Sequence, residues 1–302
     1  MTARRSRSVA TTTTTTTTTT TPAGPVFRAA GLVHVYREAE VDVAALRGVD
    51  LSVPRGQRVA LLGPSGSGKS TLLSLAAGLM RPSAGTVTVG DQDMGTASRR
   101  DLERLRRDVL GLMLQGSDVN VLRHESARAN VAWAVRGVPG RDGSLGERVL
   151  TAGDVPDDDR PVSRLTASQQ QTTALAVALA PRPRLLLADE PTSRLDREAR
   201  DALLDLLVTE TDREGIAVLL VTHDEDVARR MQRMVHLREG RIGEEDSGRG
   251  RRAVVGADGS VPIPERLRDG WPAGTLVTVE PDGDGGLVVR RADDGPTAEA
   301  TP

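Results

Sequence analysis

The stretch GPSGSGKST at residues 63–71 decides the fold, because a short apolar strand precedes it and a helical segment follows it. It contains Lys69, the only lysine of the chain, although lysine and arginine together number 40. Glycines let backbone N–H groups curl around phosphate oxygens, and the N-terminus of the following helix faces the anion. A lysine is a compact point charge on a flexible stem, whereas the planar fork of an arginine would not fit the same slot. The pattern G-x-x-x-x-G-K-[ST] therefore predicts a loop that binds nucleotide phosphates.

Two groups of residues are predicted to carry the chemistry of this site. The candidate nucleotide ligands are Gly63, Pro64, Ser65, Gly66, Ser67, Gly68, Lys69, Ser70 and Thr71. Ser70 is expected to place its hydroxyl on Mg²⁺. A second apolar strand, LLLADEP at residues 185–191, ends in Asp189, a candidate Mg²⁺ acid, followed by Glu190. A carboxylate beside the γ-phosphate can polarise an attacking water, which is worth about 10²–10⁴-fold. Alone, this pair would more simply be a strand end or helix cap; beside the phosphate loop, the catalytic interpretation is favoured.

The order of the other segments predicts an α/β fold. Residues 26–36 and 45–53 alternate apolar and polar side chains, which is typical of antiparallel strands. Downstream, strand-like and helix-like segments alternate: helices are expected over 70–80, 167–180 and 197–215, an arginine-rich helix leading into a strand over 99–115, and strands over 58–64, 85–94, 184–191 and 216–224. This alternation indicates a mostly parallel sheet with helices on both faces.

The composition indicates a folded protein with an aliphatic core. Of 302 residues, 38% are hydrophobic and only 1% aromatic, and the net charge of -2 gives no overall attraction to nucleic acid or anionic membrane. The absence of cysteine excludes disulfides and thiolate metal sites and fits a cytosolic protein. No stretch approaches the ~18 uncharged apolar residues of a membrane span. A threonine run follows the basic N-terminus where a signal peptide would be apolar, so we expect no targeting signal.

Changes of composition predict the domain boundaries. Residues 1–25, which include the threonine tract Thr11–Thr21, and residues 292–302 are expected to be disordered, because neither can repay the entropy of ordering. Residues 26–240 form the main domain. Residues 241–253 are polar and glycine-rich, which predicts a linker. Residues 254–291 form a small β-rich unit, in which PDGDGG at 281–286 lies between two strands and signals a hairpin.

From about residue 26 to residue 240 the chain resembles an ATP-binding-cassette (ABC) ATPase, the motor subunit of a transporter and a P-loop NTPase. The resemblance implies a helical subdomain at about residues 116–180. Tyr36 would stack on adenine, Gln115 in LMLQG would contact Mg²⁺ and sense a permease, and His223 in VTHD would contact the γ-phosphate. The SRLD segment, from Ser193 to Asp196, would communicate across a dimer.

Each of these residues also has a simpler interpretation. Tyr36 could be a half-buried strand residue, Gln115 a strand cap and His223 a structural histidine. Their joint order and spacing favours the roles of the family. The remaining histidines, His34, His124 and His236, match nothing in the family pattern.

The signature of the family, LSGGQ, is altered in this chain. Its counterpart reads LTASQ and comprises Leu165, Thr166, Ala167, Ser168 and Gln169. Thr166 keeps a hydroxyl for the γ-phosphate of a partner, but Ala167 and Ser168 replace both glycines, and the arginine usual after QQQ is Thr172. If either glycine position needs a left-handed backbone, a Cβ costs roughly 1–2 kcal/mol, which corresponds to a loss of about tenfold. We expect attenuated hydrolysis rather than complete loss.

The resemblance implies the cofactors and partners. Two ATPase domains of this family sandwich two ATP molecules, each held by one subunit's phosphate loop and the other's signature. ATP and Mg²⁺ would be the cofactors, and the chain would form a homodimer, or a heterodimer with a second ABC ATPase, on a membrane permease. It would be cytoplasmic and peripheral on the inner face of the cell membrane. Residues 41–57 and 99–115 and the compact length resemble the lipoprotein-release and macrolide-efflux type.

Two alternative functions remain open. One is a regulatory or DNA-associated ABC ATPase that acts through its C-terminal unit, and the other is a nucleotide-binding subunit that scarcely hydrolyses. The C-terminal unit resembles the swapped-hairpin domain of AbrB transition-state regulators at Gly259, Val261, Ile263, Pro264, Arg266, Gly274 and the VTVE strand. The preceding Arg249, Arg251 and Arg252 could meet phosphates. We favour the simpler interpretation, a β appendage that packs on the ATPase or pairs the dimer, because nearby Asp282 and Asp284 dilute the basic patch; binding of nucleic acid is not expected but stays open.

Overall fold

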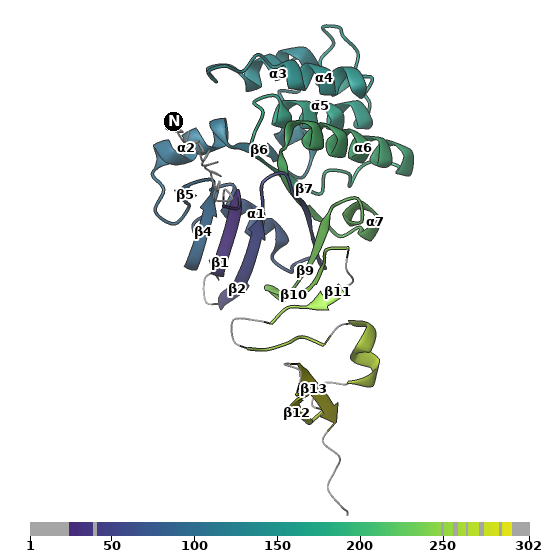
Figure 1. The fold of residues 1–302 in the computed structure, drawn as a ribbon. Helices are drawn as coiled ribbons and strands as arrows, with labels where there is room; N and C mark the ends of the chain where they lie inside the picture. The colour runs from purple at the N-terminus through teal and green to yellow at the C-terminus, as the bar shows by residue number, and fades with distance from the viewer. Residues whose placement is uncertain are drawn as a thin grey trace, which may run out of the picture.

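The centre of the protein is a seven-stranded sheet with the strand order β11-β10-β9-β3-β8-β7-β6 (Figure 1). The computed structural model describes residues 24–38, 41–248, 251–255, 259–263, 265–271, 275–283 and 286–291. Neighbouring strands from β9 to β6 are paired in parallel. Their bounds are β9 Arg233–Arg238, β3 Arg58–Leu62, β8 Ala217–Thr222, β7 Leu185–Asp189 and β6 Leu110–Met113. The mostly parallel sheet expected from the sequence is confirmed.

Both faces of this sheet are covered, which explains why its strands read as unbroken apolar runs. Along β3, Ala60 and Leu62 face one core and Val59 and Leu61 face the other. The first core is completed mainly by α5 and α6, and the second by α1 and the antiparallel sheet. The sheet therefore lies between two layers, and in open α/β sheets of this kind ligands bind at the carboxyl ends of the strands.

The antiparallel sheet has the order β2-β1-β4-β5. Its strands are β1 Phe27–Glu38, β2 Val41–Val53, β4 Ala84–Val89 and β5 Gln92–Asp93. β1 pairs with both β2 and β4, and Tyr36 lies opposite Val43. This sheet is the antiparallel β subdomain expected from the alternating pattern, and it places Tyr36 on the side of the molecule that contains α1.

The helices outside the helical subdomain have conventional termini. Ser98 and Asp101 form a capping box at the start of α2, and Asp196 caps α6, which ends at the left-handed Gly215. The bounds are α1 Lys69–Ala76, α2 Arg99–Asp108, α6 Arg197–Glu214 and α7 Glu225–Ala228. α1, α2 and α6 lie within segments that the sequence predicted to be helical, whereas the short α7 was not predicted.

A cluster of helices at one end of the molecule corresponds to the expected helical subdomain (Figure 1). It contains α3 Ala127–Ala134, α4 Ser144–Ala152 and α5 Ala167–Leu179, with the short 3₁₀ turns η1 Ser117–Val119 and η2 Val162–Arg164. Leu175 and Leu179 of α5 also belong to the core beneath the central sheet. α5 therefore connects the helical subdomain to the central sheet.

The segment expected to be a linker, residues 241–253, differs from that expectation. β10 Arg241–Asp246 and β11 Arg251–Ala253 extend the central sheet in antiparallel pairing beyond β9. The sequence did not predict this extension, because its charged residues suggested a solvent-exposed linker. In the structure, some of these charges form ion pairs across neighbouring strands. The guanidinium of Arg233 on β9, for example, binds the carboxylate of Glu245 on β10 at 2.7–2.8 Å.

The last described residues include the hairpin expected from PDGDGG. β12 Val277–Pro281 and β13 Leu287–Arg291 pair antiparallel in a sheet of their own, after the 3₁₀ turn η3 Glu265–Gly270. The exchange of hairpins between chains stays a prediction. Of the residues expected to be disordered, 1–25 and 292–302, Gly24 and Pro25 belong to no helix or strand, and the others lie outside the described residues. Among the helices that the structure describes, none combines the length and the apolar character that crossing a membrane requires.

Candidate active site

Four adjacent parallel strands deliver the predicted site residues to one edge of the sheet. The loop of residues 63–71 follows β3, His223 follows β8, Asp189 and Glu190 end β7, and Gln115 follows β6. The carboxyl ends of parallel strands meet at the same edge, which is where open α/β sheets bind ligands. Residues that are up to 160 positions apart in the sequence, from Gly63 to His223, are thereby brought together.

Lys69 is folded into the loop that it belongs to. Its Nζ donates hydrogen bonds to the carbonyl oxygens of Gly63 and Pro64, both at 2.8 Å, and the residue is only 8% exposed. Burial lowers the pKa of Lys69, while the nearby carboxylates of Glu190 and Asp189 act in the opposite direction. The ammonium is thus held by weak backbone acceptors, which an anionic phosphate can replace.

The backbone of the loop has no room for larger residues at two positions. Gly68 has a φ of +101°, and a Cβ there would collide with the carbonyl oxygen of Ala45. A Cβ on Gly63 would collide with the carbonyl oxygen of Leu237. α1 begins directly after Gly68, which has no side chain to cap it, so the first N–H groups of the helix remain available to an anion.

Asp189 has the environment of a metal ligand. The residue is 7% exposed, and among the described residues its buried Oδ1 has no hydrogen-bond partner. Burial raises the pKa of Asp189, and this effect outweighs the opposing hydrogen bond from Ser70. A buried carboxylate oxygen without a partner is costly unless a cation completes it. The oxygen donors of Asp189, Ser70 and Gln115 are of the hard type that Mg²⁺ prefers, so these residues fit that ion.

Glu190 has an unusual backbone conformation. Its φ is +47°, in the left-handed region that residues other than glycine rarely adopt. Its N–H donates to the carbonyl oxygen of Val221 at 2.9 Å, and its carboxylate lies 2.7 Å from Nδ1 of His223 and 3.4 Å from Oγ1 of Thr222. Such strain, worth of order 1–3 kcal/mol, persists only where the surroundings fix the residue, and it is concentrated at functional sites.

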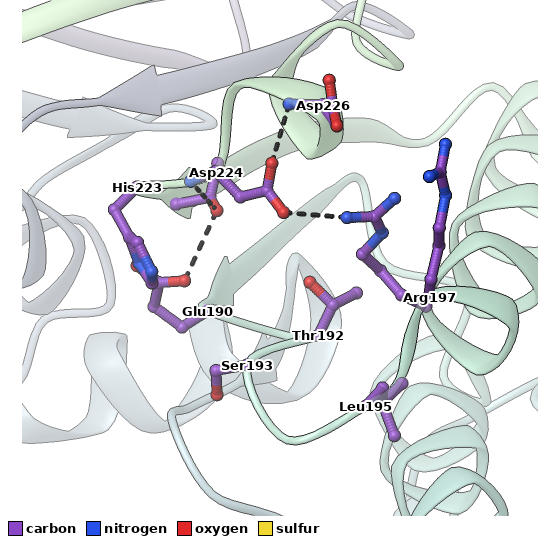
Figure 2. A pocket seen from close by; sticks show the side chains of 10 residues that line it. Glu190, Thr192, Ser193, Leu195, Arg197, His223, Asp224 and Asp226 are labelled. Atoms are coloured by element: carbon purple, nitrogen blue, oxygen red, sulfur yellow. Dashed lines mark hydrogen bonds and ion pairs between the residues drawn. The ribbon is translucent and has the colours of Figure 1, made fainter.

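A pocket of about 260 Å³ opens beside Glu190 (Figure 2). His223, Glu190 and Arg200 are among its lining residues, and the guanidinium of Arg200 binds the carboxylate of Asp224 at 3.0 Å. The carboxylate of Asp224 in turn accepts from the backbone N–H of Asp226 at 2.8 Å. Arg200, Asp224 and the backbone of Asp226 are thus bound to one another, next to the Glu190–His223 pair.

The segment SRLD continues directly from Glu190. The N–H of Ser193 donates to the carbonyl oxygen of Glu190 at 3.2 Å, and Asp196 caps α6 through the N–H of Ala199 at 2.9 Å. Ser193 and Asp196 are both exposed. Their position beside the glutamate, on the surface, is compatible with a contact to a second subunit.

Tyr36 lies in β1 of the antiparallel sheet, and Gln115 follows β6 of the central sheet. The hydroxyl of Tyr36 lies 3.1 Å from Oγ1 of Thr71 in α1, and its ring meets the ring of His34 edge-on at 4.9 Å. This half-buried tyrosine is next to the phosphate loop, as the adenine-stacking interpretation requires. Gln115 is exposed at the end of β6.

The altered signature begins α5. Thr166 caps the helix by accepting from the N–H of Gln169 at 3.2 Å, and the side chain of Gln169 accepts from the N–H of Thr166 at 3.2 Å. Ala167 and Ser168 are the first two helical residues. Neither has a positive φ, so the left-handed strain considered from the sequence does not arise. Any effect of the two lost glycines must come from side-chain bulk at the helix N-terminus.

One residue of the site was missed by the sequence argument. The side chain of Gln171, which is 7% exposed, donates from Nε2 to the carbonyl oxygen of Pro191 at 2.6 Å. It therefore ties the helix of the signature to the peptide that follows Glu190. In the run QQQ no residue stands out, and only the burial pattern of the helix could have identified this one.

Comparisons with known proteins identify the family. The model of the ABC transporter family matches residues 46–193. The lipoprotein-releasing system ATP-binding protein LolD 1 of Caulobacter vibrioides is 38% identical over 223 residues, which cover 72% of this chain and 94% of that protein. The macrolide export ATP-binding/permease protein MacB of Marinobacter nauticus is 36% identical over 229 residues, which cover 74% of this chain but only 35% of that protein.

A solved structure supports the same conclusion. The dimeric, post-hydrolysis state of the ATP-binding cassette MJ0796, bound to ADP and Pi, matches with a TM-score of 0.68 and 29% identity. The match covers 74% of this chain and 99% of that chain. Because the LolD 1 relative is 38% identical and is matched over 94% of its length, this chain belongs to the ATP-binding-cassette family of transporter ATPases, which bind ATP and hydrolyse it.

Proposed function

We propose that this chain is the hydrolytic half of a transporter motor whose output is limited by its altered signature. The observation that carries the proposal is the coexistence of an intact site, Lys69, Asp189, Glu190 and His223, with the sequence LTASQ at residues 165–169. The chain can thus have a complete set of catalytic residues for its own nucleotide, while its altered signature impairs the site at which it contacts the nucleotide of a second subunit.

Within the site, each residue has a separate task. Lys69 exchanges its two carbonyl acceptors for β- and γ-phosphate oxygens, and the N–H groups at the start of α1 bind the same anion. Glu190 accepts a proton from the attacking water, and His223 orients the glutamate through the 2.7 Å contact and contacts the γ-phosphate. Tyr36 supports adenine at the edge of the antiparallel sheet.

Asp189, Ser70 and Gln115 would hold Mg²⁺. When bound, this ion neutralises charge on the phosphate oxygens during transfer. The chain's own contribution is to hold Asp189 buried at the end of β7, where the hydrogen bond from Ser70 opposes the rise in its pKa that burial causes. Asp189 thereby aligns the phosphate loop with the glutamate that follows it.

The signature residues Thr166, Ala167 and Ser168 would act on the nucleotide of a second subunit. Two outcomes follow, depending on that subunit. A homodimer would have two impaired sites and hydrolyse slowly. In a heterodimer with an ATPase that has an intact signature, Lys69 and Glu190 of this chain would complete the one efficient site.

The helical subdomain is proposed to bind a membrane permease, which would hold this chain on the inner face of the cell membrane. Large apolar side chains on and before α3 support this proposal. Most other large apolar side chains of the cassette are buried. The exposed fraction is 65% for Val119, 42% for Leu122 and 51% for Trp133. Their proximity in sequence to Gln115 would let a permease contact influence the site. LolD and MacB suggest, by similarity, a permease of the lipoprotein-release or macrolide-efflux type.

Steady-state ATPase measurements test the proposal. The purified chain is assayed alone and then with a co-expressed permease and any second ABC ATPase encoded beside it. We expect slow turnover alone, a marked increase in the complex, and loss of both in Glu190→Gln. Fast turnover of the isolated chain, at a rate that restoring glycines at positions 167 and 168 does not increase, would reject the impaired signature.

A further inference from the structure

The side chain of Asn120 forms hydrogen bonds with the backbone on both sides of Gln115. Oδ1 of Asn120 accepts from the N–H of Leu114 at 2.8 Å. Its Nδ2 donates to the carbonyl oxygen of Leu114 at 2.7 Å and to that of Gly116 at 2.8 Å. Three of the four hydrogen bonds that an amide side chain can make are therefore spent on the two neighbours of Gln115.

Gln115 itself has little else to hold it. Its side chain is exposed, and within the described part of the chain it makes no hydrogen bond. Gly116, which follows, has a φ of +91°, a conformation that a glycine can leave as easily as it can adopt. The direction in which Gln115 leaves the sheet is consequently set by the peptides at 114 and 116, and both of these peptides are bound by Asn120.

A second asparagine makes the same kind of clamp farther from the site. Oδ1 of Asn130 in α3 accepts from the N–H of Leu122 at 2.6 Å, and its Nδ2 donates to the carbonyl oxygens of Leu122 at 3.0 Å and Ser126 at 2.9 Å. This residue is only 4% exposed. It stabilises the connection between β6 and the helical subdomain without touching the neighbours of Gln115, so it provides a matched comparison.

We infer that Asn120 is a positioning residue for Mg²⁺-dependent hydrolysis: its amide fixes the peptides on both sides of Gln115 and so aims the glutamine side chain at the metal. The inference rests on the proposed role of Gln115 as a Mg²⁺ ligand. Asn120 does not contact the nucleotide. It reduces the number of loop conformations from which Gln115 must be selected when the site fills.

The test compares the Mg²⁺ requirement of four full-length proteins: the natural chain, Gln115→Ala, Asn120→Leu and Asn130→Leu. ATPase activity is titrated with Mg²⁺ at saturating ATP, and the Mg²⁺ dependence of ADP binding is measured by calorimetry so that slow turnover does not prevent a result. We expect Asn120→Leu to raise the Mg²⁺ concentration at half-maximal effect about tenfold, at the lower end of losses from residues that orient metal ligands. Asn130→Leu should lower the melting temperature but leave the Mg²⁺ requirement within twofold of the natural chain.

A double variant separates positioning from a general loss of structure. In the Gln115→Ala background, Asn120→Leu should add little, because its effect passes through the missing glutamine. If Asn120→Leu folds poorly, Asn120→Asp replaces it: the isosteric carboxylate keeps the acceptor for Leu114 N–H but repels the two carbonyls, and should shift the Mg²⁺ requirement in the same direction.

The outcomes distinguish this inference from the role on which it rests. If Gln115→Ala raises the Mg²⁺ requirement but neither Asn120 variant does, Asn120 has no positioning role although Gln115 binds the metal. If Gln115→Ala has no effect, the proposed role of Gln115 is wrong and the inference is overturned with it. An equal shift in Asn130→Leu would show that loosening this connection anywhere has the same result, which also overturns the inference.

Discussion

Nδ1 of His223 lies 2.7 Å from Oε1 of Glu190, and the two residues leave the sheet from neighbouring parallel strands. Glu190 follows β7 and His223 follows β8, and these strands are paired up to Asp189 and Val221. The N–H of Glu190 also donates to the carbonyl oxygen of Val221. The direction of the Glu190 carboxylate is thus fixed by β8 as much as by its own strand.

Replacing the carboxylate should separate binding from hydrolysis. We expect Glu190→Gln to reduce the ATPase rate by about 10²–10⁴-fold, because the amide cannot accept the proton of the attacking water. ATP should still bind, since the phosphate loop is unchanged. Nucleotide affinity and steady-state turnover measured on the same preparation check both parts. Glu198→Gln, on the first turn of α6, is the matched control and should keep activity; a Glu190→Gln protein with normal turnover would remove Glu190 from the mechanism.

Binding of the metal should depend on pH through Asp189. Burial raises the pKa of this carboxyl, so it becomes protonated at a higher pH than an ordinary aspartate, whose pKa is about 4. Only the ionised form binds Mg²⁺, so the affinity for Mg²⁺ADP should be complete above the raised pKa and decline as the pH falls through it. Calorimetry at a series of pH values measures this decline. Asp189→Asn is the control, because the nucleotide itself titrates equally in both experiments. This variant should bind Mg²⁺ADP weakly and lack the pH dependence that comes from the Asp189 carboxyl. Identical pH profiles for the two proteins would contradict the role of Asp189.

The ion pairs between α4 of the helical subdomain and α6 should contribute to stability. Arg148 of α4 binds Glu210 at 2.9 Å and Glu214 at 2.6 Å, both on α6, and these hydrogen bonds raise the pKa of Arg148. The carboxylate of Glu210 is nearly buried. Arg148→Met should therefore lower the free energy of unfolding by about 3 kcal/mol, since it leaves a buried charge without its main partner. Denaturant titration measures this change.

Arg128 provides the comparison for that experiment. It pairs with Glu147 and Asp157, but its side chain is 59% exposed. Arg128→Met should cost less than about 1 kcal/mol, as is usual for exposed ion pairs. Similar losses in the two variants would mean that the Arg148 network has no special stabilising role.

The sequence predicted the parts of this protein that follow from local patterns. The phosphate loop, the apolar strands and the hairpin at 281–286 were recognisable because glycines, hydrophobic runs and turn residues determine backbone conformation nearby. β10 and β11 were not, because cross-strand pairs such as Arg233–Glu245 are invisible without the register. The clamps of Gln171 and Asn120 also depend on side chains that meet backbone groups of another segment, and no spacing rule indicates them.

The C-terminal hairpin should contribute to dimerisation. Val277, Val279, Leu287 and Val289 share one face by register, and each is 41–68% exposed. A two-stranded hairpin is marginal on its own and needs a covering surface. Deleting residues 254–302 should lower dimerisation, measured by analytical ultracentrifugation, more than it lowers DNA affinity; a salt-sensitive DNA shift lost on deletion would indicate the reverse.

Restoring the glycines of the signature should increase activity while it reduces stability. Ala167 and Ser168 occupy the first helical positions of α5 without left-handed strain, so each glycine introduced there should cost roughly 0.5–1 kcal/mol of folding free energy. Activity should nevertheless rise, because removing both side chains lets the helix N-terminus and the hydroxyl of Thr166 approach the γ-phosphate of a second subunit. The double variant Ala167→Gly/Ser168→Gly is assayed for turnover and for unfolding, with Ala174→Gly in the middle of α5 as the control that loses stability alone. Faster turnover in the double variant only would place the limitation at the signature, whereas unchanged turnover would mean that LTASQ does not restrict hydrolysis in this chain.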